Sequence, residues 1–159
     1  MVTRRAPKIL VTTTSLRPSN KTPIHGSTGN WYAIYGVEIP PPIRFGDLFD
    51  VSYSLHVTND AFRPDNNPVI WETQVVLATS LSDSTSGTDV LPQVGPHRIG
   101  DAAHHALVVD RGLFVSPGNY LSTRYIKLLA WFKHPDANGS QDMECPDNNL
   151  GMQCLRYRS

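Results

Sequence analysis

The stretch that decides the fold is Asp50–Thr58, which reads D-V-S-Y-S-L-H-V-T. Apolar side chains occupy every second position of this stretch, and polar side chains fill the positions between them. The apolar set is Val51, Tyr53, Leu55 and Val57, and the polar set is Ser52, Ser54 and His56. This alternation predicts an antiparallel strand with one buried face and one face turned to water.

Similar runs lie on both sides of this stretch. Pro40-Pro41-Pro42 ends the run that precedes it, because proline cannot donate a hydrogen bond to a β-ladder. After Val109, the sequence Asp110-Arg111-Gly112 predicts a turn that leads into a further strand. The predicted strands are Trp31–Ile39, Asp50–Thr58, Val69–Ala78, Ala103–Val109, Leu113–Val115, Tyr125–Lys133 and Gln153–Arg158.

The segments between these runs are rich in turn-forming residues, and helical periodicity is nearly absent. Asn59–Pro68, Ser80–Thr88, Pro117–Asn119 and His134–Leu150 all read as turns or loops. Many short strands joined in this way predict an all-β fold, an antiparallel β-sandwich that is jelly-roll-like. An immunoglobulin-type sandwich is the second choice, since both cysteines lie at the far C-terminal end.

The N-terminal part of the chain differs from the rest in composition. Residues 1–25 contain no acidic and no aromatic residue, and the first acid is Glu38. We therefore predict an extended basic arm over residues 1–30, followed by a β-sandwich domain over residues 31–159. Such an arm cannot offset its ordering entropy by burying its own apolar surface.

The arm has two interpretations. It is either a disordered terminus or a tether that lies on a neighbouring protein. As a tether, its basic side chains would face an acidic patch, and its short apolar run would add a strand to an exposed sheet edge. The residues expected to bind a partner in this way are Arg4, Arg5, Lys8, Ile9, Leu10 and Val11.

The charge composition limits the classes of partner. The formal net charge is zero and only 18% of the residues are charged, which favours self-association over binding to nucleic acid. Five basic residues without aromatic neighbours are a weak signal for RNA or DNA, so we expect no nucleic-acid partner. No apolar run has the length of a membrane span, so we expect no membrane partner.

One predicted strand, Tyr125–Lys133, has one apolar face and one face that mixes apolar and basic side chains. Ile126, Leu128, Ala130 and Phe132 form a face that belongs in the core. The opposite face carries Lys127, Leu129, Trp131 and Lys133. Trp131 lies either under a loop or second sheet, or in a subunit contact, or in a platform that stacks on sugars.

Few residues are arranged for catalysis or metal binding. His104 and His105 are adjacent, so on a strand they point to opposite faces and cannot share one metal ion. No nucleophile motif or phosphate-binding loop is present. We therefore expect no enzyme activity, no cofactor and no metal. Whether Cys145 and Cys154 form a disulfide is left open.

Several short motifs resemble small jelly-roll modules in virion proteins of tailed bacteriophages. They are Gly46-Asp47 before Phe49–Tyr53, then Val57-Thr58-Asn59, then Ala103-His104-His105-Ala106. The resemblance covers the chain from Trp31 to its end and implies a head-decoration protein or tail component. It also implies a homo-oligomer, with a trimer favoured, that binds the major capsid protein or other virion proteins.

These observations together predict a structural virion protein that docks on a protein shell through its arm and sheet faces. The alternative is a carbohydrate-binding or receptor-binding module, with Trp31, Trp71 or Trp131 as the stacking ring. A third alternative is a cupin-type metalloenzyme, which would need histidines distant in the sequence to converge. The expected location of the protein is the virion.

Overall fold

The protein is described from a computed structural model. The structure describes residues 8–9, 14–15, 21–24, 29–59, 69–82, 84–99, 104–133, 143–146 and 151–158. No helix occurs among these residues. Their strands are β1 (Lys8–Ile9), β2 (Thr14–Ser15), β3 (Lys21–Ile24), β4 (Asn30–Ile39), β5 (Leu48–Asn59), β6 (Val69–Ala78), β7 (Thr88–Asp89), β8 (Val94–Ile99), β9 (His104–Val115), β10 (Arg124–Lys133), β11 (Met143–Pro146) and β12 (Met152–Tyr157).

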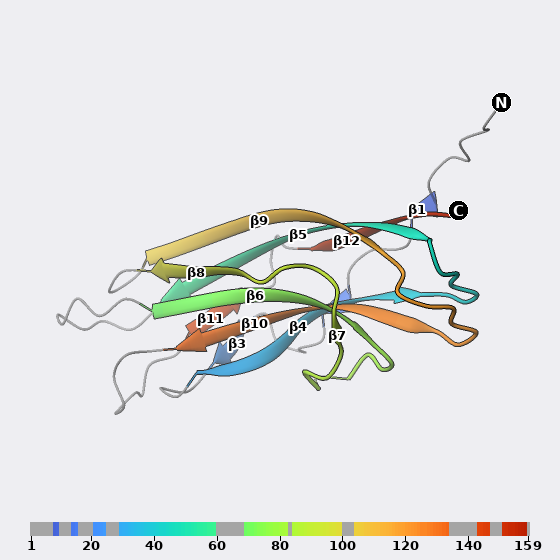
Figure 1. Ribbon diagram of the computed structural model, residues 1–159. Helices are drawn as coiled ribbons and strands as arrows, with labels where there is room; N and C mark the ends of the chain where they lie inside the picture. Colours follow the sequence, from blue (N-terminus) through green and yellow to red (C-terminus); the bar gives the residue numbers. More distant parts are fainter. Residues whose placement is uncertain are drawn as a thin grey trace.

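The strands form two sheets in which every described pairing is antiparallel. The first sheet has β5 at its centre, with β9 on one side and both β11 and β12 on the other. The second sheet has the order β2-β4-β10-β6-β7, and β8 also pairs with β6. The long strands of both sheets extend along the length of the molecule (Figure 1). The predicted all-β class, an antiparallel and jelly-roll-like β-sandwich, is thus confirmed.

The main core lies between the two sheets and follows the predicted alternation. Val51, Tyr53 and Leu55 of β5 are buried, whereas Ser52 and Ser54 are only partly covered. The second sheet contributes inward side chains from three strands: Val37, Ile39, Trp71, Val75, Ile126, Leu128 and Ala130. Their removal from water is the main favourable contribution to folding.

A polar contact crosses this core. The hydroxyl groups of Tyr53 on β5 and Thr73 on β6 lie 2.7 Å apart and share a hydrogen bond. Burial raises the pKa of Tyr53 to about 12, so the phenol stays protonated in neutral solution. The bond satisfies two buried hydroxyl groups and fixes how the two sheets lie against each other.

The predicted turn at Asp110-Arg111-Gly112 is wrong. Strand β9 continues without interruption from His104 to Val115, and all three residues pair with β5. The full-length partner strand keeps this segment extended. Gly112 instead allows the side chain of Leu91 to come close to the β9 backbone, because a Cβ atom there would lie 2.6 Å from Cδ1 of Leu91.

The segment 134–150, predicted as one long loop, also contains a strand. β11 pairs with both β3 and β5, and β12 continues along the same edge of β5. Glu144 pairs with Thr58, whereas Cys154 pairs with Val51, so the two cysteines lie about 20 Å apart along the sheet. That separation excludes a disulfide between them. Cys154 is a free, buried thiol whose pKa burial raises to about 12.

Candidate functional site

Two loops join at one end of the sandwich to form a surface that we call the loop platform. It consists of residues 40–47, between β4 and β5, and residues 116–123, between β9 and β10. Both loops lie at the same end of the molecule as the C-terminal end of β12 (Figure 1). Ile43 and Tyr120 exchange two backbone hydrogen bonds, of 2.9 and 2.8 Å. The amide of Phe45 donates a further bond of 2.9 Å to the side chain of Asn119.

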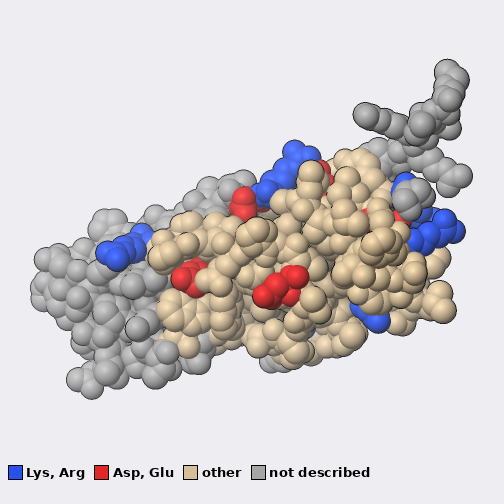
Figure 2. Space-filling view, viewed as in Figure 1, with Lys and Arg blue, Asp and Glu red and all other residues tan. Residues whose placement is uncertain are grey.

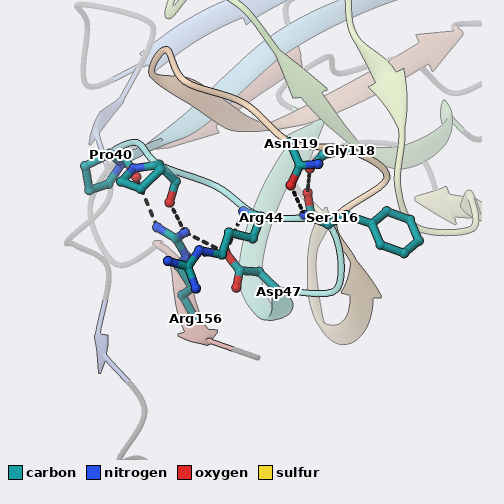
Figure 3. Close-up of polar contacts among 9 residues, drawn as sticks. Pro40, Arg44, Asp47, Ser116, Gly118, Asn119 and Arg156 are labelled. Carbon is teal, nitrogen blue, oxygen red and sulfur yellow. Dashed lines mark hydrogen bonds and ion pairs between the residues drawn. The ribbon is translucent and has the colours of Figure 1, made fainter.

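A buried ion pair holds the loop platform from below. Arg156 of β12 is 2% exposed, and its guanidinium donates to the carboxylate of Asp47 at 2.6 and 3.1 Å. It also donates to the carbonyl oxygens of Pro40 and Pro42. Figure 3 shows this arrangement, with the guanidinium enclosed by the first loop. Because one cation satisfies three acceptor groups of the loop 40–47, that loop is fixed to the sheet below it.

Further bonds fix the turn geometry of the platform. The carboxylate of Asp47 accepts from the backbone amide of Arg44 at 3.0 Å. The amide of Ser116 donates to the carbonyl oxygen of Asp47, and its hydroxyl donates to that of Gly118. Figure 3 shows these side chains within one compact set of loops. The platform therefore keeps one shape before any partner arrives.

Large apolar side chains are exposed on the loop platform. Phe45 is 67% exposed and Leu121 is 89% exposed. Leu113 and Val115 are exposed near the end of β9, which leads into the second platform loop. On the face shown in Figure 2, charged side chains are scattered among uncharged ones. Apolar groups held outward on a rigid support are typical of a surface that contacts another protein.

A concave feature lies on the outer face of the β2-β4-β10-β6-β7 sheet, and we call it the outer groove. Its volume is about 300 Å³. Its floor includes Trp31, Val76 and Leu129, and its wall comes from the segment between β6 and β8. Ala33, Val76 and Leu129 form a small buried cluster there, and Trp31 packs against it. Both faces of this sheet are therefore covered in part.

The predicted partner-binding residues have different outcomes. Arg4, Arg5, Leu10 and Val11 lie outside the described residues. Lys8 and Ile9 form β1, which pairs with β12 of the same chain at Arg156 and Leu155. Ile9, the first residue of the short apolar run, thus pairs with a sheet edge of its own chain. Binding of the arm to a neighbour stays a prediction.

The three tryptophans lie in three different environments. Trp71 is fully buried in the main core, where its ring lies 4.6 Å from the ring of His97, so it offers no stacking face. Trp131 pairs with Trp31 across β10 and β4. A Cβ atom on Gly29 would lie 2.5 Å from the Trp131 ring, so this side chain packs closely under Gly29. Only Trp31 lines the outer groove.

An ion pair on the outer face of the first sheet joins an exposed side chain to a buried one. Arg111, which is 68% exposed, donates to the carboxylate of Asp50 at 2.7 Å. The hydrogen bond from Arg111 lowers the pKa of Asp50, and partial burial opposes that shift. Solvent screens the Arg111 side of this pair, whereas the Asp50 carboxylate is covered.

The described residues give no sign of a metal centre or membrane helix. No three His, Cys, Asp or Glu side chains among them cluster as metal ligands would. The side chains of His104 and His105 are not described. In the part of the chain that the structure covers, there is also no helix long and apolar enough to cross a bilayer.

Comparison with known proteins gives a structural match only. No protein-family model matches the chain, and no curated protein matches its sequence. A chain in the structure of infectious bursal disease virus, Gx strain, is similar over 98% of this chain at 11% identity, with a TM-score of 0.58. This chain spans 37% of the length of that viral chain. The similarity supports the fold.

A second solved structure has a lower similarity. It is the CBM22-1 xylan-binding domain from Paenibacillus barcinonensis Xyn10C, aligned over 98% of both chains at 14% identity, with a TM-score of 0.31. That score is too low to indicate a shared fold.

Sequence reasoning missed the loop platform. Asp47 and Arg156 are 109 residues apart, and Phe45 and Asn119 are 74 apart, so no local pattern joins them. One local signal was present. Phe45 is an aromatic residue within a Pro- and Gly-rich connection, where side chains are usually exposed.

Proposed function

We propose that this chain is a structural protein of a virus particle, which contacts other virion proteins through its loop platform. The observation that carries the proposal is the exposure of Phe45 and Leu121 on loops that the buried Asp47–Arg156 pair holds in place. A preformed apolar surface lowers the entropic cost of association. The fold similarity to a chain of a virus structure supports the same assignment.

The proposed role is one of contact and not of catalysis. The partner is a second copy of this chain, with a trimer favoured, or another protein of the particle, as for a shell or decoration subunit. The near-neutral composition agrees with a protein that associates. The arm is a second proposed contact, with Arg4, Arg5 and Lys8 facing an acidic neighbour.

The test compares the purified chain with a Phe45→Ser, Leu121→Ser double variant. We expect the wild-type chain to self-associate with rising concentration in sedimentation velocity, or to co-sediment with particles of the virus that encodes it. The double variant should stay monomeric and unbound, because it removes the two most exposed apolar groups of the platform.

The control is Arg98→Ser, which truncates an exposed side chain of β8 and lies outside the platform loops. It should associate as the wild type does. A wild-type chain that is monomeric at every concentration and is absent from purified particles would overturn the proposal. Association that survives the double variant would place the contact elsewhere.

A further inference from the structure

The outer groove is a built site whose wall is anchored by two buried polar side chains. Lys127 of β10 is fully buried, and its ammonium donates to the carbonyl oxygens of Ser82 and Ser84 at 2.9 and 2.7 Å. Gln74 of β6 is also buried and donates to the carbonyl oxygen of Leu91. Both ends of the covering segment are thus tied to the sheet, which keeps the groove open.

The lining of the groove combines one aromatic side chain with several hydrogen-bonding groups. Trp31 is partly exposed and supplies an apolar face. The polar groups are the carboxylate of Asp89, the hydroxyl of Thr85 and the amides of Gln74 and Gln93. The groove volume of about 300 Å³ lies at the lower end of the range for small-molecule sites.

Most of the hydrogen-bonding atoms that remain available in the groove are acceptors. The amide nitrogen of Gln74 already donates to Leu91 and Val75, and that of Gln93 donates to the carboxylate of Glu72. The carboxylate of Asp89 and the amide oxygens accept hydrogen bonds only. A ligand that fits them must therefore bring several donors, as a molecule with many hydroxyl groups does.

The charged side chains around the groove further limit the class of ligand that can bind. Asp89 lines the groove and Glu72 lies beside it through Gln93, whereas no arginine or lysine is among the lining residues that the structure describes. Lys127, which pairs with Val76 of the groove floor, donates to the carbonyl oxygens of Ser82 and Ser84. An anionic ligand would be repelled here, and a neutral one would not.

We infer that the outer groove binds a neutral saccharide unit, with a sugar ring packed against Trp31 and its hydroxyl groups donating to Asp89 and the glutamine amides. The apolar face of a sugar ring suits an aromatic surface, and its hydroxyl groups suit an acceptor-rich wall. This inference does not depend on the proposed contact role of the loop platform, because the two surfaces share no residue.

The experiment screens the purified chain against arrays of neutral and sialylated oligosaccharides, followed by titration of the best neutral glycan with tryptophan fluorescence. We expect binding of neutral glycans and none of sialylated ones. Trp31→Ala should weaken binding by about tenfold or more, as is usual for a central aromatic anchor. Asp89→Ala should weaken binding as well. Because Asp89 is exposed, this variant is not expected to have a folding defect.

Trp131→Ala is the matched control, because Trp131 is paired with Trp31 on the same sheet but does not line the groove. It should leave glycan affinity unchanged. A methylammonium ligand serves as a contrasting probe for an acidic aromatic site. Binding of this cation without any neutral glycan would overturn the inference. So would glycan binding that is unaltered in both Trp31→Ala and Asp89→Ala.

Discussion

At the scale of single residues, Arg156 shows how one buried charge supports an exposed surface. Its guanidinium binds Asp47 and two proline carbonyl oxygens, and both charged side chains are excluded from water. Replacing such a pair with apolar groups can be neutral, but removing one partner leaves the other charge buried. The pair is therefore best understood as a device that fixes the loops, and its stability depends on both partners.

We predict that Arg156→Met lowers the free energy of unfolding by about 3–5 kcal/mol, because it leaves Asp47 buried without its cation. Urea denaturation measures the change. Arg98→Met is the control, since Arg98 is exposed on β8 and a surface substitution there should change stability by no more than about 0.5 kcal/mol. Equal losses in the two variants would contradict the role assigned to the buried pair.

At the scale of elements, side-chain alternation predicted the strands that have one buried face. β4, β5, β6, β10 and β12 all lie within a residue or two of their predicted bounds. In β6, Val75 and Leu77 enter the main core and Val76 enters the outer cluster. Alternation reports burial, so it succeeds wherever a strand crosses the core.

The same reasoning failed where tertiary contacts override local preference. Gly112 is a turn former in the sequence, but in the fold it admits Leu91 between the sheets. β7 is a short edge strand and β11 is a short strand between β5 and β3, and partner strands define both more than their own side chains do. The platform and the groove were unpredictable for the same reason, since each joins segments distant in the sequence.

The segment that covers the outer groove should depend on Lys127. Lys127→Met removes the ammonium group that donates to the carbonyl oxygens of Ser82 and Ser84. We therefore predict faster amide hydrogen exchange in the segment between β6 and β7. The expected loss of stability is about 1–3 kcal/mol. Arg124→Met, on the same strand, is the control because Arg124 donates only to Ser122 and Thr123. Unchanged exchange in the Lys127 variant would show that the segment is held by other contacts.

At the scale of the whole molecule, three short described parts of the first thirty residues pair with the two sheets. β1 lies on β12 of one sheet, β2 lies on β4 of the other, and β3 lies on β11. Composition alone marked this region as separate, because it lacks acids and aromatics. Backbone pairing needs neither, so a polar segment can still cover an open edge.

This arrangement leads to a prediction that separates the edge-covering role from the charge of the arm. Deleting residues 1–15 removes β1 and β2 and leaves the outer backbone groups of β12 and β4 unpaired. Open edges pair with other chains, so we expect a lower melting temperature and irregular aggregates in sedimentation velocity. Deleting residues 1–7 removes Arg4 and Arg5 but keeps both strands, and it should leave the melting temperature unchanged.

If the shorter deletion were equally harmful, the basic side chains would matter and edge pairing would not. If the longer deletion instead converted a defined oligomer into a soluble monomer, the strands would be exchanged between copies, and the arm would be the tether that its composition first suggested.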